Sequence, residues 1–461
     1  MNTASAALYR TIWRWHFYAG VIVAPFMVIL ALTGAIYLFN DEINDVLHRE
    51  KRIVRPVAQS IPLSRMIEAA VAQLPGAVAT RIDTPKDPDR SAEIFVKPAK
   101  GEPRRVFVDP GTGTVLGSYV YSRTLVGFAD VFHGSLFMGD FGDAIVELAA
   151  CWGFILTVTG LYLWWPKGRT TFRGVITPRW ASSGRTFWRS LHSAVGAWTA
   201  LLIMFLIITG LPWATIWGGL LRQGADSAGI GYPKSFRGYG APASGTETIE
   251  AASQGAAPWT TQKAPAPQSA PAGHHGHGLV SGQAQGHAIS IDRVAEILAG
   301  AGMRAPYRLS LPRDATGVFL AFTYPDHPET QRSLYIDQYD GRIIGDVRFA
   351  DYGVAAKAVE LGVQIHMGNY FGRANQIVML LPCLSIVILA ITGPYMWWLR
   401  RPKGQLAAPR VVAPLTLRAI ALITIGLGLV FPLAGASLVV VVVLDSVLRH
   451  SLGSSRGAIE R

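Results

Sequence analysis

Cysteine is almost absent from this chain. Its 461 residues include two cysteines, Cys151 and Cys383, and both stand inside apolar runs. A disulfide framework or a thiolate metal cluster needs several cysteines at short spacings. The sequence therefore excludes both.

Charged residues are also few. They make up 16% of the chain, against about 25% in soluble domains, while hydrophobic residues reach 50%. Such a chain cannot hide its apolar surface in one soluble core, which excludes a plain cytosolic enzyme, and it is too hydrophobic to be disordered over most of its length. The net charge of +12 does not indicate nucleic-acid binding, because Lys and Arg flank apolar segments instead of forming one stripe. That placement is typical of an integral membrane protein.

Long apolar runs are what the chain does contain. A helix needs about 20 residues to cross some 30 Å of hydrocarbon, and four runs are long enough: Phe17 to Phe39, Ile145 to Trp165, Ala194 to Trp217 and Ile377 to Leu399. The tail from Leu415 to Leu448 is too long for one span, and Pro432 and Gly435 interrupt it. We therefore expect a terminal pair of helices and about six membrane helices in total. No cleavage site follows the first run, so it is retained as an anchor.

Basic residues predict the orientation. Lys and Arg are concentrated before the first run, between Lys167 and Arg189, and after the fourth run. The positive-inside rule places these three regions in the cytoplasm. The remaining segments then lie in the periplasm of a bacterial inner-membrane protein. This divides the chain into an N-terminal helix (1–39), a first periplasmic segment (40–143), the second and third helices with their loop (144–217), a second periplasmic segment (218–375), and the fourth helix with the terminal pair (376–461).

The membrane runs are duplicated. Thr-Ile-Trp-Arg-Trp-His16 is followed by Gly20 and by Thr33-Gly34, and Thr-Phe-Trp-Arg-Ser-Leu-His192 by Gly196 and Thr209-Gly210 at the same intervals from the histidine. In the second and fourth runs, His133 precedes Thr159-Gly160 by the interval that separates His366 from Thr392-Gly393. A Trp-Trp pair begins four residues after Gly160 and after Gly393. Chance does not produce four matched spacings.

The outer segments repeat as well. Each contains a short amphipathic stretch, Ile61 to Leu74 or Ile289 to Leu298, followed by strand-like stretches and an Asp-x-x-x-Gly turn at Asp109 or Asp337. We therefore predict an α-helical membrane protein with tandem repeats, each made of a span, a small α+β domain and a second span.

A segment rich in Ala, Pro, Gly, Ser and Gln lies between Ala241 and Ala288. We interpret it as a disordered external linker. It carries His274, His275, His277 and His287. These could capture a transition metal weakly, but an incidental low-complexity tract is favoured because no carboxylate or Cys completes a site.

Four histidines occupy the duplicated positions. His16 and His192 start outward-going helices at the cytoplasmic face, and His133 and His366 precede inward-going helices at the outer face. A single interfacial His could merely cap a helix, but a two-fold arrangement of the halves would bring like positions together. The pattern thus predicts two His pairs at opposite faces, suited to bis-His haem b.

Glycines near these histidines fit the same interpretation. Gly20 and Gly196, one turn after His16 and His192, lie on the same helix face and leave room for a flat cofactor. The glycines of the Thr-Gly pairs could serve cofactor clearance or helix packing. No Cys-x-x-Cys-His is present, so covalent haem attachment is excluded.

As a set, these motifs resemble the PepSY-associated transmembrane family, also called iron-regulated inner-membrane proteins, which includes siderophore-iron reductases. The resemblance runs from Tyr9 to about Leu448 and is carried by Trp-His16-Phe-Tyr-Ala-Gly20, Trp-Arg-Ser-Leu-His192, Phe-His133-Gly and Ile-His366-Met-Gly, with their Thr-Gly and Trp-Trp partners. It implies two periplasmic PepSY domains, b-type haem and electron delivery to ferric chelates. The long His-bearing linker departs from the family pattern and leaves the identity of the metal open.

These observations favour a haem-dependent membrane oxidoreductase. It would take electrons from the cytoplasmic side or the quinol pool and reduce a periplasmic ferric siderophore, releasing Fe(II). No catalytic residue is expected apart from the haem ligands. The donor, a quinol or a cytoplasmic flavoprotein, must be external because the sequence contains no nucleotide motif. Two alternatives are a transporter, disfavoured by the scarcity of carboxylates in the spans, and a non-catalytic PepSY module that regulates a periplasmic partner.

Overall fold

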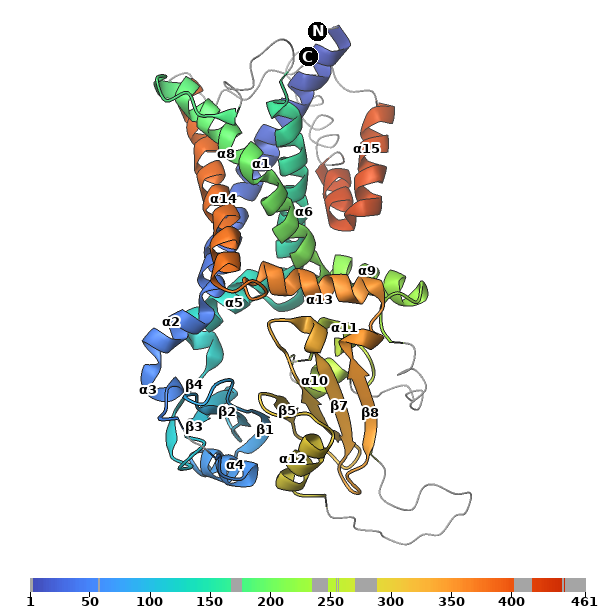
Figure 1. Cartoon of the computed structure of the whole chain (residues 1–461). Helices are drawn as coiled ribbons and strands as arrows, with labels where there is room; N and C mark the ends of the chain where they lie inside the picture. Colours follow the sequence, from blue (N-terminus) through green and yellow to red (C-terminus); the bar gives the residue numbers. More distant parts are fainter. Residues whose placement is uncertain are drawn as a thin grey trace, which may run out of the picture. The chain divides into compact units, whose positions relative to one another are not determined.

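The computed structural model describes residues 3–56, 59–166, 176–233, 248–253, 255, 257–269, 288–401, 417–441 and 443 (Figure 1). The chain forms two compact units, each assembled from segments far apart in sequence. The membrane unit comprises Met1–Leu38, Asp130–Leu221 and Gln376–Arg461, and the sheet unit comprises Phe39–Ala129 and Arg222–Asn375.

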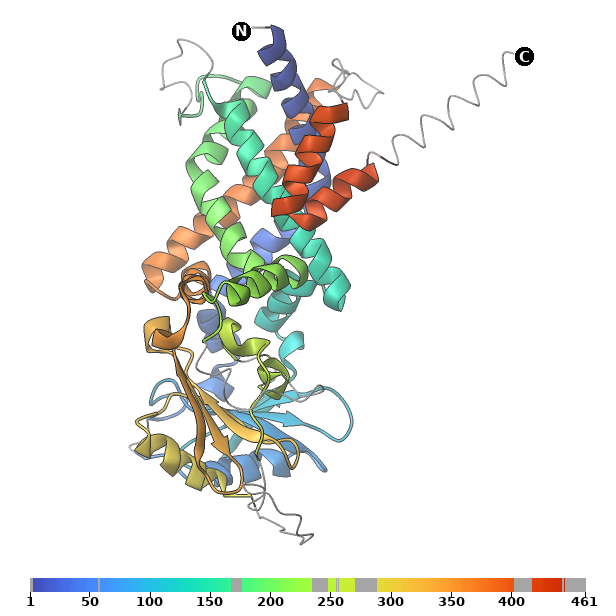
Figure 2. The ribbon, with the colours of Figure 1, turned by 90° about the vertical axis from the view of Figure 1, so that its right-hand side faces the viewer.

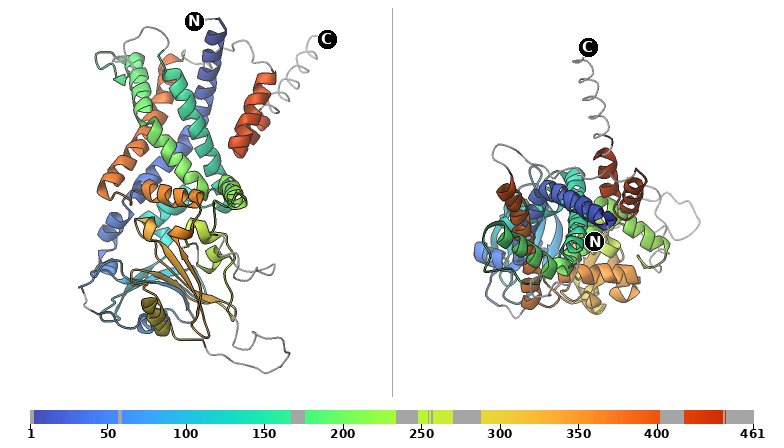
Figure 3. Two further views of the ribbon diagram at one scale, coloured as in Figure 1. Left: turned by 45° about the vertical axis from the view of Figure 1, so that its right-hand side comes forward. Right: turned by 90° about the horizontal axis from the view of Figure 1, so that it is seen from above.

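Four long helices build the membrane unit: α1 (Thr3–Leu38), α6 (Gly139–Trp164), α8 (Gly184–Gly210) and α14 (Arg373–Arg400). Among the described residues, these four are long and apolar enough to cross a membrane, and they contain the four apolar runs. They gather into one bundle (Figure 2 and Figure 3). Val23 and Met27 of α1 pack against Ala149 of α6, and Cys151 of α6 packs near Ile203 of α8.

The terminal apolar stretch forms α15 (Leu417–Val430) and a second helix over Pro432–Val441, separated at Phe431. The break predicted at Pro432 is therefore present. A Cβ on Gly435 would lie 2.4 Å from the Cα of Gly428, so only glycine lets the two helices approach this closely. Within the described residues each helix is shorter than the roughly 20 residues of a span, and the count of six spans stays a prediction.

Two tryptophans hold the terminal pair against the bundle. Trp152 Nε1 donates to Ser437 Oγ at 3.1 Å, and Trp217 Nε1 donates to the Val430 carbonyl at 2.9 Å. Phe431 is buried with Phe154 of α6 and Leu211. The pair is thus packed onto α6 and the C-terminal end of α8.

Carboxylates of α6 cap the N-terminus of α9 (Thr215–Ser227). Asp143 Oδ2 accepts from the Thr215 backbone N at 2.7 Å, and the buried Glu147 accepts from the N–H groups of Ile216 and Trp217 at 3.0 and 3.2 Å. A helix N-terminus leaves such N–H groups unpaired and favours negative charge. Glu147 therefore has a structural partner.

The sheet unit contains an eight-stranded antiparallel sheet in the order β4-β3-β2-β1-β5-β6-β7-β8. The first half supplies β1 to β4 and the second half β5 to β8, with these bounds: Val78–Asp83, Ala92–Lys97, Arg104–Val108, Val115–Tyr119, Arg308–Ser310, Val318–Phe322, Arg332–Asp337 and Ile343–Arg348. The halves join where β1 pairs with β5, with Arg81 opposite Ser310 and Ile82 opposite Leu309. The two predicted small domains therefore share one sheet.

One face of this sheet is covered by α4 (Leu63–Ala72) and α12 (Ile291–Gly300) (Figure 2). Alternate strand residues supply the apolar core beneath them, including Ile82, Ile94, Leu309 and Leu334. The helices also contact each other, since Ser64 N and Oγ donate to the Asp292 carboxylate at 3.1 and 2.5 Å.

Shorter helices complete the described chain. They are α2 (Asn40–Leu47), α3 (Arg49–Arg52), α5 (Leu125–Ser135), α10 (Ile249–Ala252), α11 (Trp259–Gln262) and α13 (Val354–His366), with 3-10 turns at Tyr121–Arg123, Leu211–Trp213, Pro328–Thr330 and Phe349–Asp351.

The structure corrects the predicted linker. Residues 248–253 and 257–269 fall inside the segment predicted to be disordered, yet they contain α10 and α11. Trp259 is buried, and Thr260 N and Oγ1 donate to Glu360 Oε1 of α13 at 3.0 and 2.8 Å. Composition did not predict these helices, because their buried Trp259 and Ile249 stand among many small residues. His274, His275, His277 and His287 lie outside the described residues.

Candidate functional site

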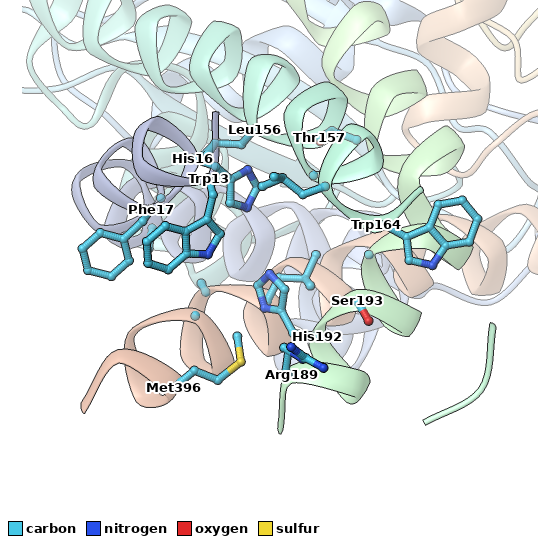
Figure 4. A pocket seen from close by; sticks show the side chains of 18 of the residues that line it. Trp13, His16, Phe17, Leu156, Thr157, Trp164, Arg189, His192, Ser193 and Met396 are labelled. Carbon is cyan, nitrogen blue, oxygen red and sulfur yellow. The ribbon is translucent and has the colours of Figure 1, made fainter. Parts of the chain in front are cut away.

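A cavity of about 900 Å³ lies among α1, α6, α8 and α14 of the membrane unit (Figure 4). Cofactor and ligand sites usually measure about 300–1,000 Å³. His16 and Gly20 line it from α1, and His192 and Gly196 line it from α8. Figure 4 shows the imidazoles of His16 and His192 pointing toward one another. The structure thus brings together His16 and His192, called the inner pair below, and the two glycines that the sequence analysis identified.

Helical spacing places these residues on one face. The α1 residues that line the cavity include Trp13, His16, Phe17, Gly20, Ala24 and Met27, which follow the three- and four-residue steps of one helix face. From the imidazoles towards Met27, Gly153 and Ile203 the lining is mostly apolar, with Thr157 as a polar member. Trp164 and Trp397 line the cavity nearer the helix ends.

A threonine hydroxyl holds each imidazole of the inner pair. His16 Nδ1 lies 2.9 Å from Thr159 Oγ1, and His192 Nδ1 lies 2.8 Å from Thr392 Oγ1. Both hydroxyls already donate within their own helices, to the carbonyls of Ile155 and Ile388, each at 2.7 Å. A hydroxyl has one hydrogen, so it accepts from the imidazole, and the proton stands on Nδ1.

This proton placement leaves the lone pair on Nε2. In neutral imidazole one nitrogen donates and the other accepts. Within the described part of the chain, neither Nε2 of the inner pair has a hydrogen-bond partner. A metal-bound imidazole is typically held in this way, with one nitrogen on the metal and the other donating to a second partner.

The glycines of the Thr-Gly pairs make room for the same imidazoles. A Cβ on Gly160 would lie 3.2 Å from His16 Cε1, and one on Gly393 would lie 3.7 Å from His192 Cε1. The sequence left packing and cofactor clearance open for these glycines. The structure places both against the rings of the inner pair. Sequence analysis did not predict that the threonines hydrogen-bond to the histidines. The repeated interval between each His and a Thr-Gly pair was the signal that could have indicated it.

His133 has the same arrangement near the other end of α1. Its Nδ1 lies 2.9 Å from Thr33 Oγ1, which donates to the Ile29 carbonyl at 2.7 Å. A Cβ on Gly34 would lie 3.3 Å from His133 Cε1. His366 ends α13, in the sheet unit. The pairing of His133 with His366 therefore stays a prediction.

The inner pair fits a haem. A haem macrocycle supplies four ligands to its iron, so two axial imidazoles complete six-fold coordination. Two available Nε2 atoms face one cavity of suitable size. Among the described residues, no group of three or more His, Cys, Asp or Glu side chains is arranged to hold a metal ion.

No curated protein matches this chain closely enough to be counted as a relative. The family described as PepSY-associated TM region matches residues 13–400, which take in the inner pair, both halves of the sheet and all four long helices apart from the first residues of α1. The terminal helix pair lies beyond the match. The chain belongs to the family of the PepSY-associated TM region.

Proposed function

We propose that this membrane protein holds b-type haem and passes electrons across the bacterial inner membrane to a ferric chelate in the periplasm. The observation that supports it best is the inner pair, His16 and His192, which face each other across one cavity with the proton of each ring held on Nδ1. Haem bound there would supply a one-electron couple at its iron.

The residues around the inner pair have separate tasks in this proposal. His16 and His192 would hold the haem iron through Nε2, and Thr159 and Thr392 would fix their tautomer and orientation. Gly20 and Gly196 keep the cavity open. A Cβ at Gly20 would lie 3.9 Å from Leu156 Cδ2, and one at Gly196 would lie 3.5 Å from Leu389 Cδ2. Both are ordinary contacts, so helix packing does not require glycine there.

A second haem is proposed with His133 as one ligand, and the duplication in the sequence predicts His366 as the other. His133 forms the same kind of hydrogen bond as His16 and His192, with Thr33 Oγ1 as its partner. His16 and Thr33 are 17 residues apart on α1, or about 26 Å along the helix, so the two sites would lie near opposite faces. A single tunnelling step over that distance would be too slow for turnover.

The ferric chelate is the proposed substrate, and the sheet unit is the part proposed to contact it. One electron converts Fe(III) to Fe(II), which hydroxamate or catecholate oxygens bind less tightly, so the metal is released. The electron donor is proposed to be a quinol or a cytoplasmic flavoprotein.

Reduction across a sealed membrane tests this proposal. Protein is reconstituted into liposomes with a reductant trapped inside, a ferric siderophore outside, and an external dye that reports Fe(II). The wild type should generate Fe(II) outside, and His16→Ala and His192→Ala should not. Thr199→Val is the control, because Thr199 of α8 does not line the cavity. Equal rates in the wild type and in both inner-pair variants would contradict the proposal.

A further inference from the structure

Four arginines line the same cavity as the inner pair. Arg10 comes from α1, Arg185 and Arg189 from α8, and Arg400 from α14. Arg185 and Arg189 precede His192 by seven and three residues, so they share its helix face. Arg189 and His192 lie close together in Figure 4.

The part of the chain that the structure describes supplies no carboxylate partner to these four arginines. Within the described residues none of them forms an ion pair, and the guanidinium of Arg400 instead lies over the Trp13 ring, 4.9 Å from its centroid. The sequence contains no Asp or Glu in residues 1–40, 148–225 and 361–444. Asp143 and Glu147, on the outer half of α6, cap α9. Arg10, Arg185 and Arg189 are exposed and Arg400 is half-buried, so solvent screens part of their mutual repulsion. An anion held among them would offset the rest, and no carboxylate of the described residues is placed there to supply it.

The rule that cytoplasmic ends are basic does not explain why Arg189 lines the cavity. Arg14 and Arg189 both follow Trp in the repeated Trp-Arg motif, but Arg14 precedes His16 by two residues and Arg189 precedes His192 by three. One residue turns a helix by about 100°. Arg14 accordingly does not line the cavity and lies over Tyr18. The second copy of the motif carries one extra residue, and that residue turns its arginine into the cavity.

We infer that these arginines bind the two carboxylates of the ligand held by His16 and His192. The inference rests on the proposed function, in which the carboxylates are the haem propionates. The planar fork of arginine matches a carboxylate with two parallel hydrogen bonds. The phosphate of a lipid headgroup has similar chemistry and is the other source of an anion at this position.

Esterified haem tests the inference. Apoprotein from haem-starved cells is titrated with protohaem and with its dimethyl ester, which lacks both carboxylates. The wild type should bind protohaem at least about 10-fold more tightly, because the ester cannot form the charged hydrogen bonds that the carboxylates form with arginine. Arg189→Gln combined with Arg400→Gln should weaken protohaem binding about 10- to 100-fold and leave binding of the ester unchanged. Arg14→Gln is the matched control and should change neither.

A second readout is the midpoint potential. Removing positive charge beside the iron favours the ferric state, so the double variant should have a more negative potential than the wild type and Arg14→Gln. Equal binding of acid and ester by the wild type, with no response to the double variant, would overturn the inference. Loss of copurified anionic phospholipid in that variant, with acid and ester still bound equally, would assign the arginines to lipid instead. If neither compound binds, the proposed function fails and this inference fails with it.

Discussion

Threonine hydroxyls control the chemistry of single residues at this site. Because Thr159 and Thr392 donate to backbone carbonyls, they accept from the histidines and keep Nε2 unprotonated. Replacing either threonine by valine removes that acceptor at nearly constant volume. We expect Thr159→Val and Thr392→Val each to lower haem affinity about 10- to 100-fold, measured by haem titration of the apoprotein.

Two further variants make the threonine test specific. Thr199 of α8 donates in the same way to the Val195 carbonyl at 2.8 Å but does not line the cavity. Thr199→Val should therefore bind haem like the wild type, and Thr159→Ser, which keeps the hydroxyl, should recover most of the affinity. Wild-type affinity in Thr159→Val would show that the threonine does not position the ligand.

Glu360 makes the stability of the sheet unit depend on pH. Burial raises the pKa of Glu360, and hydrogen bonds from Thr260 only partly offset the effect. The folded chain therefore binds more protons than the unfolded chain once the pH exceeds the ordinary pKa of a glutamate. The stabilisation is complete below that ordinary value and is lost as the pH rises through the raised pKa.

Glu360→Gln tests how much of the pH dependence of stability comes from Glu360. The amide keeps an oxygen that accepts from Thr260 but cannot ionise. Melting temperatures of the purified full chain between about pH 5 and pH 9 should fall more steeply with rising pH for the wild type than for the variant. Parallel curves would exclude Glu360 as the titrating group.

The segment that contains α10 and α11 was predicted to be disordered, but it packs against the rest of the sheet unit. Arg222 lies over the Trp259 ring, 4.2 Å from its centroid, and donates to the Trp259 carbonyl. Ser269 N also donates to the Thr316 carbonyl at 2.9 Å. We expect Trp259→Ala to destabilise the sheet unit by about 3–5 kcal/mol. Faster limited proteolysis of the full-chain variant than of the wild type would report this loss of stability.

Deletion of residues 271–287, which carry all four linker histidines, is the contrasting change. It should leave haem content and proteolytic stability as in the wild type. A large loss of ferric reduction with haem retained would show that this tract delivers metal to the protein.

Among the elements, the sequence predicted those with a local signal. The four apolar runs correspond to helices of the structure, and strand-like stretches predicted after Leu74 and after Leu298 correspond to strands such as β2 and β6. The junction of β1 with β5 was not predictable, because β5 has three residues and its partner lies in the other half of the chain. Likewise, duplication predicted that His16 and His192 meet, but the hydrogen bonds of Thr159 and the arginine cluster depend on how neighbouring helices face each other.

For the molecule as a whole, the family and four apolar helices establish a membrane protein. The buried carboxylate of α6, Glu147, caps α9. It therefore gives no support to a charged path for a transported ion. The arrangement of the inner pair is what favours a haem protein over a transporter or a purely regulatory module.

The number of haems in each histidine variant tests the central claim most directly. Pyridine haemochrome analysis of the purified wild type should give two b haems per chain. His16→Ala, His192→Ala and the double variant should each retain one, because both residues hold the same haem. Absence of haem from the wild type, or loss of both haems in the double variant when each single variant loses only one, would contradict the account.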